Sequence, residues 1–390
     1  MTSQRAAKTT RESENILRLA QDLGAERLVW HSRPTEVEFG FNNHCNLLCV
    51  MCHQADGIPS KRMPVEQSRA VLDQVLPFAL HLTPSDASEP LMNDLDEIVR
   101  LCEEYNVLMS MYCNATLLDE KRLHKIAPWT HRIWFSIDSP EKETFEALRV
   151  QSNFEKVCEN IRAAMPVLEE QLVDVGFNAV VMEPNWRQMP ELVDFVADLG
   201  GRTLALQELL PNSTGYEELK IEGRVSEEEF GAMVAAVRER AQARGVDLTL
   251  QLHPPHGGEQ GVPLEYRPTK APLTTVREVH MESLAKMSPG FCSMAMNYVK
   301  ITPDGKVYPC CRGPEELEMG NVLEESFEDI WNGERYQEFR RQMFQGEYPE
   351  VCASCIVLTG PDHFPGNQPA ENGHADNGHA DGNGHAPADS

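Results

Sequence analysis

Short apolar runs and longer amphipathic segments alternate along the chain from Glu36 onward. The short runs are rich in β-branched and aromatic residues and predict strands, whereas apolar residues at helical spacing predict helices. The predicted strands are residues 37–41, 78–82, 107–112, 132–137, 173–181 and 203–206. The helices predicted between them are residues 65–76, 91–104, 119–126, 154–169 and 189–199. This alternation is typical of an α/β fold with a parallel sheet, whose ligands bind where the strands' carboxyl ends meet.

The same pattern divides the chain into consecutive parts. Residues 227–244 predict one more amphipathic helix, and residues 257–270 are rich in Gly and Pro, which indicates a loop or a domain junction. The last residues are rich in Gly, Asn, Asp and Ala and should be disordered, because they cannot bury a core. The expected parts are a helical lead-in (1–34), the strand-and-helix region (35–250), a connecting region (251–289), a cysteine-containing region (290–358) and the tail (359–390).

Composition and charge narrow the class of protein. The 390 residues carry a formal charge of −26, which disfavours binding to nucleic acid and to anionic membranes. No run approaches the ~20 apolar residues of a transmembrane helix, and the N-terminus lacks the apolar core of a signal peptide. We therefore expect a cytoplasmic protein. In a reducing compartment its 11 cysteines indicate metal binding rather than disulfides.

Three of these cysteines follow the first predicted strand. Cys45, Cys49 and Cys52 have the spacing C-x3-C-x2-C. Thiolates on one short loop can hold three irons of a 4Fe–4S cube and leave the fourth iron open to another ligand. The alternatives are buried cysteines or a zinc loop, but zinc sites favour C-x2-C pairs that add up to four ligands.

This spacing, directly after a strand, resembles the radical S-adenosylmethionine (SAM) superfamily. The resemblance implies a partial (β/α)6 TIM-like barrel whose open iron binds SAM. It also implies one-electron cleavage of SAM to methionine and a 5′-deoxyadenosyl radical, which abstracts hydrogen from the substrate. A reducing protein such as flavodoxin or ferredoxin would supply the electron.

Later strand ends resemble further motifs of this family. Residues 85–91 are similar to its G-G-E-P loop, with Ala87 and Ser88 in place of the glycines, although Ser88 could instead cap a helix that has Pro90 in its first turn. Residues 113–117 are similar to its T-N-G-T segment, and residues 136–139 to its S-x-D segment, where Asp138 could also act as a helix cap. The resemblance makes four residues candidate SAM contacts, namely Glu89, Asn114, Ser136 and Arg149. Position alone adds Asn178, Gln207 and Glu208 to the same rim.

The C-terminal region carries five more cysteines. Asp304-Gly305 between two β-rich runs predicts a hairpin, and a helical stretch is expected to follow from residue 320 to about residue 344. The region resembles the SPASM/twitch extension of radical SAM enzymes. The resemblance implies one auxiliary 4Fe–4S cluster on Cys292, Cys310, Cys352 and Cys355, and a four-cysteine zinc site is the alternative.

The remaining cysteines have simpler interpretations. Cys102 and Cys158 fall on predicted helices and are expected in the core. Cys113 lies at a strand's catalytic end, where a redox role can be considered. Cys311 is a replacement ligand, a hydrogen donor or, by default, a buried thiol. Cys113 and Cys311 are thus the weak catalytic candidates.

Three hypotheses for function remain open at this stage. The first is a radical SAM oxidoreductase that oxidises or epimerises a small polar molecule, such as a sugar or an aminocyclitol. The second is a peptide maturase that modifies a ribosomally made precursor, as many SPASM relatives do. The third is a non-enzymatic iron–sulfur scaffold. The sequence does not identify the substrate.

Overall fold

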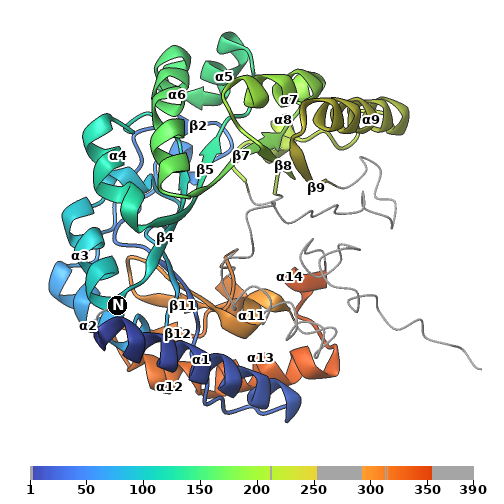
Figure 1. Cartoon of the computed structure of the whole chain (residues 1–390). Helices are drawn as coiled ribbons and strands as arrows, with labels where there is room; N and C mark the ends of the chain where they lie inside the picture. Colours follow the sequence, from blue (N-terminus) through green and yellow to red (C-terminus); the bar gives the residue numbers. More distant parts are fainter. Residues whose placement is uncertain (1–2, 211–212, 253–291, 312, 314, 354–390) are drawn as a thin grey trace, which may run out of the picture.

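One curved sheet organises the molecule (Figure 1). The computed structural model describes residues 3–210, 213–252, 292–311, 313 and 315–353, so the predicted loop at 257–270 and the predicted disordered tail lie outside the described residues. The sheet has ten strands in the order β12-β11-β10-β1-β3-β4-β5-β7-β8-β9. The strands from β10 to β9 are parallel to their neighbours, and β11 and β12 are antiparallel.

The bounds of the elements follow the hydrophobic pattern closely. The strands are β1 (Glu36–Phe39), β2 (Leu48–Cys49), β3 (His81–Thr83), β4 (Leu108–Cys113), β5 (Thr130–Ser136), β6 (Arg149–Val150), β7 (Asp174–Val181), β8 (Thr203–Glu208), β9 (Asp247–Gln251), β10 (Tyr298–Ile301), β11 (Lys306–Tyr308) and β12 (Gly320–Asn321). The helices are α1 (Ser3–Gly24), α2 (Val65–Val75), α3 (Leu95–Tyr105), α4 (Glu120–Ile126), α5 (Lys142–Leu148), α6 (Phe154–Glu170), α7 (Met189–Asp198), α8 (Tyr216–Leu219), α9 (Glu227–Arg244), α11 (Ser293–Asn297), α12 (Phe327–Trp331), α13 (Glu334–Gln345) and α14 (Glu350–Ala353).

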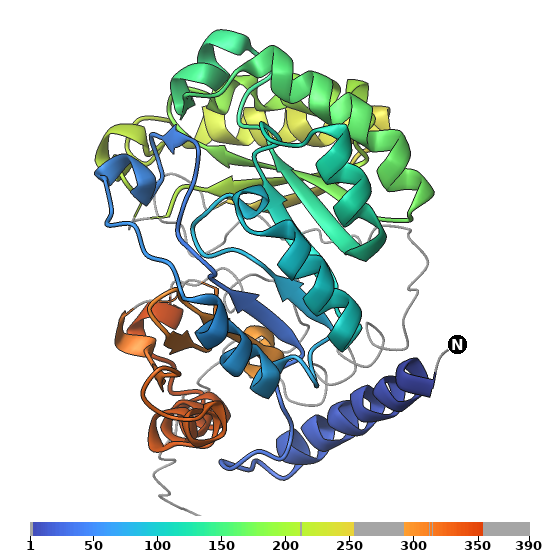
Figure 2. The same cartoon turned by 90° about the vertical axis from the view of Figure 1, so that its left-hand side faces the viewer.

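The two faces of the sheet have different characters. Helices cover its convex face, as Figures 1 and 2 show. Side chains alternate between the faces along a strand, and those toward the helices are apolar and fully buried, such as Phe39, Met111 and Phe135. The residues between them, such as Glu38 and Tyr112, face the concave side, which we call the inner face. The burial of apolar residues on one face leaves the inner face available for polar chemistry.

The structure confirms the parallel α/β sheet and corrects the strand count. A seventh barrel strand, β9, pairs with β8. Polar and apolar residues alternate along Asp247–Gln251, as they do in a short strand. The predicted hairpin is confirmed by the antiparallel pairing of β10 with β11. The prediction of one continuous helical stretch from residue 320 is wrong. Gly320–Asn321 is a strand, and the stretch is divided into α12 and α13 at Asn332 and Gly333.

Aromatic residues join the segment after α1 to the C-terminal helices. The Trp331 indole donates a hydrogen bond to the Ser32 carbonyl oxygen at 2.8 Å, and its ring lies edge-on to Trp30 at 5.9 Å. The buried Arg340 guanidinium lies 4.3 Å from the Trp30 ring, 4.7 Å from the Trp331 ring and 5.1 Å from the Tyr336 ring. These contacts fix the C-terminal region against the start of the barrel.

Trp134 on β5 lies across Gly176 on β7. A Cβ at residue 176 would meet the Trp134 ring at 2.6 Å, closer than a real side chain allows. We expect Gly176→Ala to lower the free energy of unfolding by about 1–3 kcal/mol, the usual cost of overpacking. Thermal denaturation measures the change. Gly231→Ala in α9, where a Cβ would meet nothing within 4 Å, is the control and should stabilise by about 0.5–1 kcal/mol. Equal effects at the two positions would contradict the prediction.

None of the helices in the described part of the chain has the length and apolar character that crossing a bilayer requires.

Candidate functional site

The three cysteines of the C-x3-C-x2-C segment lie on one loop at the carboxyl edge of the sheet. The loop follows β1 and is held by a small two-stranded sheet, in which Cys49 on β2 is aligned with Arg149 on β6. The Val50 amide adds a hydrogen bond to the Leu148 carbonyl oxygen at 3.0 Å. Backbone pairing thus fixes the middle cysteine, while Cys45 and Cys52 stay partly exposed.

The three thiols suit a cluster better than a single metal ion. Burial raises the pKa of the Cys45 thiol and raises the pKa of the Cys49 thiol to about 11, and the three sulfurs are near enough to influence one another electrostatically. No group of three His, Cys, Asp or Glu side chains among the described residues converges on a point that would hold one ion. A cubane binds each thiolate at a different iron, so its three cysteines surround a cube instead of meeting at one ion. This donor set therefore fits a 4Fe–4S cluster.

Glu89 connects two strand ends beneath this loop. Its buried carboxylate accepts hydrogen bonds from the Asn114 amide at 2.8 Å, the Leu91 amide at 3.2 Å and the Cys113 thiol at 3.3 Å. Burial raises the pKa of Glu89 to about 7, and the two amides oppose that rise. The alternative of a helix that starts here with Pro90 in its first turn is confirmed, but its N-cap is Glu89 and not Ser88.

The two weak catalytic candidates occupy very different places. Cys113 has no exposed surface and lies on the helix-covered face of β4, where it bonds to Glu89. Cys311 is exposed, so the default expectation of a buried thiol is wrong. Burial raises the pKa of Tyr112 and of Tyr298 on the inner face, and Cys311 contributes to both shifts. Cys102 and Cys158 are buried, as expected.

Asn114 and Arg149 contact the cysteine loop from two sides. The Asn114 side-chain amide donates to the Cys45 sulfur at 3.9 Å and to the Asn46 side-chain oxygen at 3.1 Å. The Arg149 guanidinium donates to the Cys49 sulfur at 3.9 Å. Arg149 also pairs with Asp138 at 2.7 Å, so Asp138 holds this arginine and does not cap α5, whose N-cap is Glu141.

The other predicted contacts lie on neighbouring strands of the sheet. The Ser136 hydroxyl donates to the Asn178 side-chain oxygen at 3.4 Å, and the Gln207 amide donates to Gln251 at 3.0 Å. Alternation along β8 places Glu208 on the opposite face from Gln207. The structure therefore brings Ser136, Asn178 and Gln207 to the inner face and separates Glu208 from them.

Sequence reasoning missed a charged cluster on the inner face. Lys300 on β10 lies 2.7 Å from the Asp86 carboxylate and 3.3 Å from Glu38 on β1. Tyr298 donates a hydrogen bond to Glu38, and Tyr112 is 55% exposed on the same face although β4 is a central strand. The sequence signal was the alternation of Glu36 and Glu38 with apolar residues on β1 and the single charged residue Lys300 on β10.

Three of the four cysteines expected to bind the auxiliary cluster lie within the described residues. Cys292, Cys310 and Cys352 all pack against the main core, whereas Cys355 lies outside the described residues. Burial raises the pKa of Tyr348, and Cys292 and Cys352, which are 60 residues apart in the sequence, raise it further.

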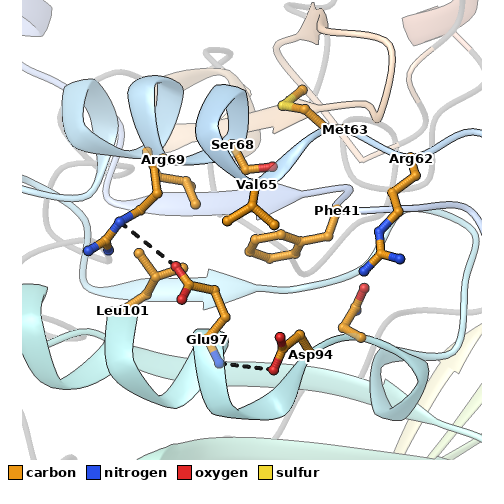
Figure 3. Close-up of a pocket in the computed structure, with 11 residues that line it drawn as sticks. Phe41, Arg62, Met63, Val65, Ser68, Arg69, Asp94, Glu97 and Leu101 are labelled. Atoms are coloured by element: carbon orange, nitrogen blue, oxygen red, sulfur yellow. Dashed lines mark hydrogen bonds and ion pairs between the residues drawn. The ribbon is translucent and has the colours of Figure 1, made fainter.

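A separate apolar pocket lies between α2 and α3 (Figure 3). Arg69 and Glu97 form an ion pair at its wall, with 3.8 Å between Nε and Oε1. None of its lining residues is a cysteine or a predicted SAM contact, and the helices that form it cover the convex face of the sheet. The pocket is therefore not the candidate active site. It is lined by Phe41, Arg62, Met63, Val65, Ser68, Arg69, Leu72, Asn93, Asp94, Glu97 and Leu101.

Two alanines beside the site adopt a backbone conformation that favours glycine. Ala87 has φ 48° and Ala115 has φ 58°. A non-glycine residue in this left-handed region costs about 1–2 kcal/mol. Glycine in turn lowers stability by about 0.5–1 kcal/mol, because it loses more conformational freedom on folding. The Ala115 methyl group is buried, and its removal costs about 0.8 kcal/mol, so we expect Ala115→Gly to change the free energy of unfolding by less than about 1 kcal/mol. Ala235→Gly, at an exposed position of the helix α9, is the control for an ordinary backbone conformation and should destabilise by about 1 kcal/mol. Thermal denaturation measures both, and a larger loss at residue 115 than at residue 235 would contradict the expectation.

Comparison with protein-family models places two families on the chain. The radical SAM superfamily matches residues 40–196, and the SPASM iron–sulfur cluster-binding domain matches residues 292–356. Together they include all the cysteines of the two groups described above.

Individual relatives share these regions at low identity. A probable GTP 3′,8-cyclase of Halobacterium salinarum is 30% identical over 48% of this chain and 54% of its own length. The antilisterial bacteriocin subtilosin biosynthesis protein AlbA of Bacillus subtilis is 20% identical over 83% of this chain and 64% of its own length. The chain thus spans about half to two thirds of these curated relatives.

Solved structures share the fold. Streptococcus suis SuiB bound to its precursor peptide SuiA has a TM-score of 0.59 and 16% identity, covering 87% of this chain and 73% of SuiB. The structure of anSMEcpe with bound AdoMet has a TM-score of 0.56 and 17% identity, covering 84% of this chain and 88% of its own.

Proposed function

Because the chain belongs to the radical SAM superfamily and carries a C-terminal SPASM domain, we propose that it removes a hydrogen atom from a small polar substrate bound on the inner face. The cofactors of such an enzyme are SAM, the 4Fe–4S cluster that binds SAM and an auxiliary iron–sulfur cluster. When bound, SAM and its cluster supply a 5′-deoxyadenosyl radical. Every other part of the proposal concerns what this chain's own residues do.

In this proposal Cys45, Cys49 and Cys52 hold the SAM-binding cluster. Glu89 fixes the backbone of Asn114 by accepting its amide at 2.8 Å, so that the strand end beside the loop is rigid. Ser136, on the inner face, would contact SAM. The curved sheet would form one wall of the site and limit the access of water to a reactive radical.

The C-terminal cysteines would hold the auxiliary cluster. We assign Cys292, Cys310, Cys352 and Cys355 to it from the sequence resemblance, and the matched SPASM domain includes all four. Oxidation of the substrate radical to a ketone requires the loss of one electron and one proton. These cysteines would hold the electron acceptor, and Glu38 and Asp86 offer carboxylates on the inner face for the proton. Return of a hydrogen atom from the exposed Cys311 thiol would give epimerisation instead, and the thiyl radical left on Cys311 would then need one proton and, from the auxiliary cluster, one electron.

The observation that supports this proposal most directly is the environment of the cysteine loop. Backbone pairing fixes it at the carboxyl edge of a parallel sheet, where such folds bind their ligands. The charged groups of the inner face, led by Lys300 between two carboxylates, support a polar substrate.

The second candidate is modification of a ribosomally made peptide. It is favoured because the bacteriocin biosynthesis protein AlbA and the structure of SuiB with its precursor peptide both align with most of this chain. A peptide could lie on the same inner face, and the polar groups there would then contact its backbone. Binding of a precursor peptide encoded beside the gene would favour this candidate over a sugar or an aminocyclitol.

An assay that combines anaerobically reconstituted protein with SAM and dithionite tests the proposal. We expect 5′-deoxyadenosine to accumulate, and deuterium from the correct labelled substrate to appear in it. Chromatography with mass spectrometry measures both. Protein that carries its full iron content but yields no 5′-deoxyadenosine would favour the scaffold hypothesis instead.

A further inference from the structure

Two of the three thiols on the cysteine loop accept a side-chain hydrogen bond. Arg149 Nη1 lies 3.9 Å from the Cys49 sulfur, and Asn114 Nδ2 lies 3.9 Å from the Cys45 sulfur. The sequence motifs had assigned both donors to SAM. In the structure, their N–H groups point at the atoms that would bind iron.

Arg149 is held in this position from two directions. Its backbone is aligned with that of Cys49 in the β2–β6 pair, which sets the distance between the two residues. Its Nε lies 2.7 Å from the Asp138 carboxylate, which has no exposed surface. Asp138 is in turn fixed by the Val180 amide, which donates to it at 2.8 Å. A guanidinium fixed at both ends is a permanent charge beside the sulfur.

Asn114 is held in a comparable way but is neutral. Its side-chain oxygen accepts from the Thr116 hydroxyl at 2.6 Å and from the Thr116 amide at 3.0 Å, which directs its NH2 group toward Cys45 and Asn46. Asn46 also donates to Thr116 at 2.8 Å. This closed network leaves Asn114 one orientation, with an N–H group toward the sulfur.

Hydrogen bonds to cluster sulfurs are among the features that set the reduction potential of an iron–sulfur cluster. A one-electron reduction adds negative charge, so a nearby cation or N–H dipole stabilises the reduced form and raises the potential. The charged Arg149 should act more strongly than the neutral Asn114. Asp138 lies behind the guanidinium and offsets part of its field.

We propose that Arg149 and Asn114 are positioning residues that raise the reduction potential of the SAM-binding cluster through Cys49 and Cys45, with Arg149 contributing more. The inference rests on the proposed function, since it requires the cluster on this loop. It assigns Arg149 to the cluster rather than to SAM itself.

The test compares midpoint potentials of the reconstituted proteins by redox titration monitored by electron paramagnetic resonance. The signal that changes when SAM is added identifies the relevant cluster. Arg149→Gln keeps a side-chain N–H donor but removes the charge, and it should shift the midpoint to a more negative potential. Asn114→Leu should give a smaller shift in the same direction, and Asp138→Asn a shift in the opposite direction. Arg100→Gln, an identical change on the surface of α3, should give none.

The dissociation constant for SAM separates this inference from the motif assignment. We expect Arg149→Gln to keep its iron and to leave that constant within about tenfold, or 1.4 kcal/mol, of the wild-type value. An unchanged midpoint with weaker SAM binding would overturn the inference. If Arg149→Gln loses its iron, Asn114→Leu decides, and a midpoint equal to the wild type in that variant would overturn the inference. A wild-type protein that takes up no SAM-binding cluster would instead refute the proposed function.

Discussion

Replacing Cys45, Cys49 and Cys52 together by alanine is expected to reduce 5′-deoxyadenosine formation to the background of the reagents. The three side chains supply all the protein ligands that the proposal gives to the SAM-binding cluster. Their loss should remove about four irons per chain and leave about four on the C-terminal cysteines, by the stoichiometry of a cubane. Iron analysis and anaerobic SAM-cleavage assays on the same preparations measure the two effects.

Cys158→Ala is the control for this experiment. Cys158 is buried on α6 and lies in the apolar core, so its replacement removes a thiol without touching either group of cysteines. It should keep both the iron content and the cleavage activity of the wild type. If the triple variant still cleaved SAM, or if it lost all its iron while folded, the assignment of two separate cysteine groups would be wrong.

Trp331→Ala should lower the free energy of unfolding by about 3–5 kcal/mol, the range for removing a large buried aromatic side chain. The indole has no exposed surface, and it contacts Trp30, Phe327 and Tyr336. Its removal also leaves the Ser32 carbonyl oxygen without the hydrogen bond that Trp331 donates at 2.8 Å. Chemical denaturation of the anaerobically handled protein measures the change.

Trp331→Phe separates packing from hydrogen bonding at this position. It retains most of the aromatic contact but removes the indole N–H, so its cost should be well below that of alanine. If Trp331→Ala lowered the free energy of unfolding by less than about 1 kcal/mol, the substitution would behave like an ordinary one on the surface. That result would show that the C-terminal helices contribute little to the stability of the barrel.

The hydrophobic pattern predicted the parallel sheet because its strands are buried on the helix-covered face and are bounded by clear helical segments. It missed β9, a strand of five residues in which only Thr249 and Leu250 are buried. It also placed a helix at Gly320–Asn321, where pairing with Lys306 and Val307 on β11 determines the structure. A strand this short is determined by its pairing with another segment, and that pairing leaves no pattern in the strand's own residues.

The site shows the same division between local and long-range information. The spacing of Cys45, Cys49 and Cys52 was visible in the sequence because one loop carries all three. The contact of Arg149 with Cys49 was not visible, since it depends on a two-residue antiparallel pair between segments 100 residues apart. The charged group around Lys300 was hidden for a similar reason, because β10 joins the sheet beside β1.

That joining of β10 to β1 has a consequence for the synthesis of the protein. The ribosome completes β1 early, but the strand that covers its second edge follows about 260 residues later, as the Tyr298–Glu38 contact shows. Until then the nascent barrel presents an unpaired edge, which is the kind of surface that aggregates or recruits chaperones. A truncated chain that ends before residue 298 would keep that edge permanently open and should be poorly soluble on that account.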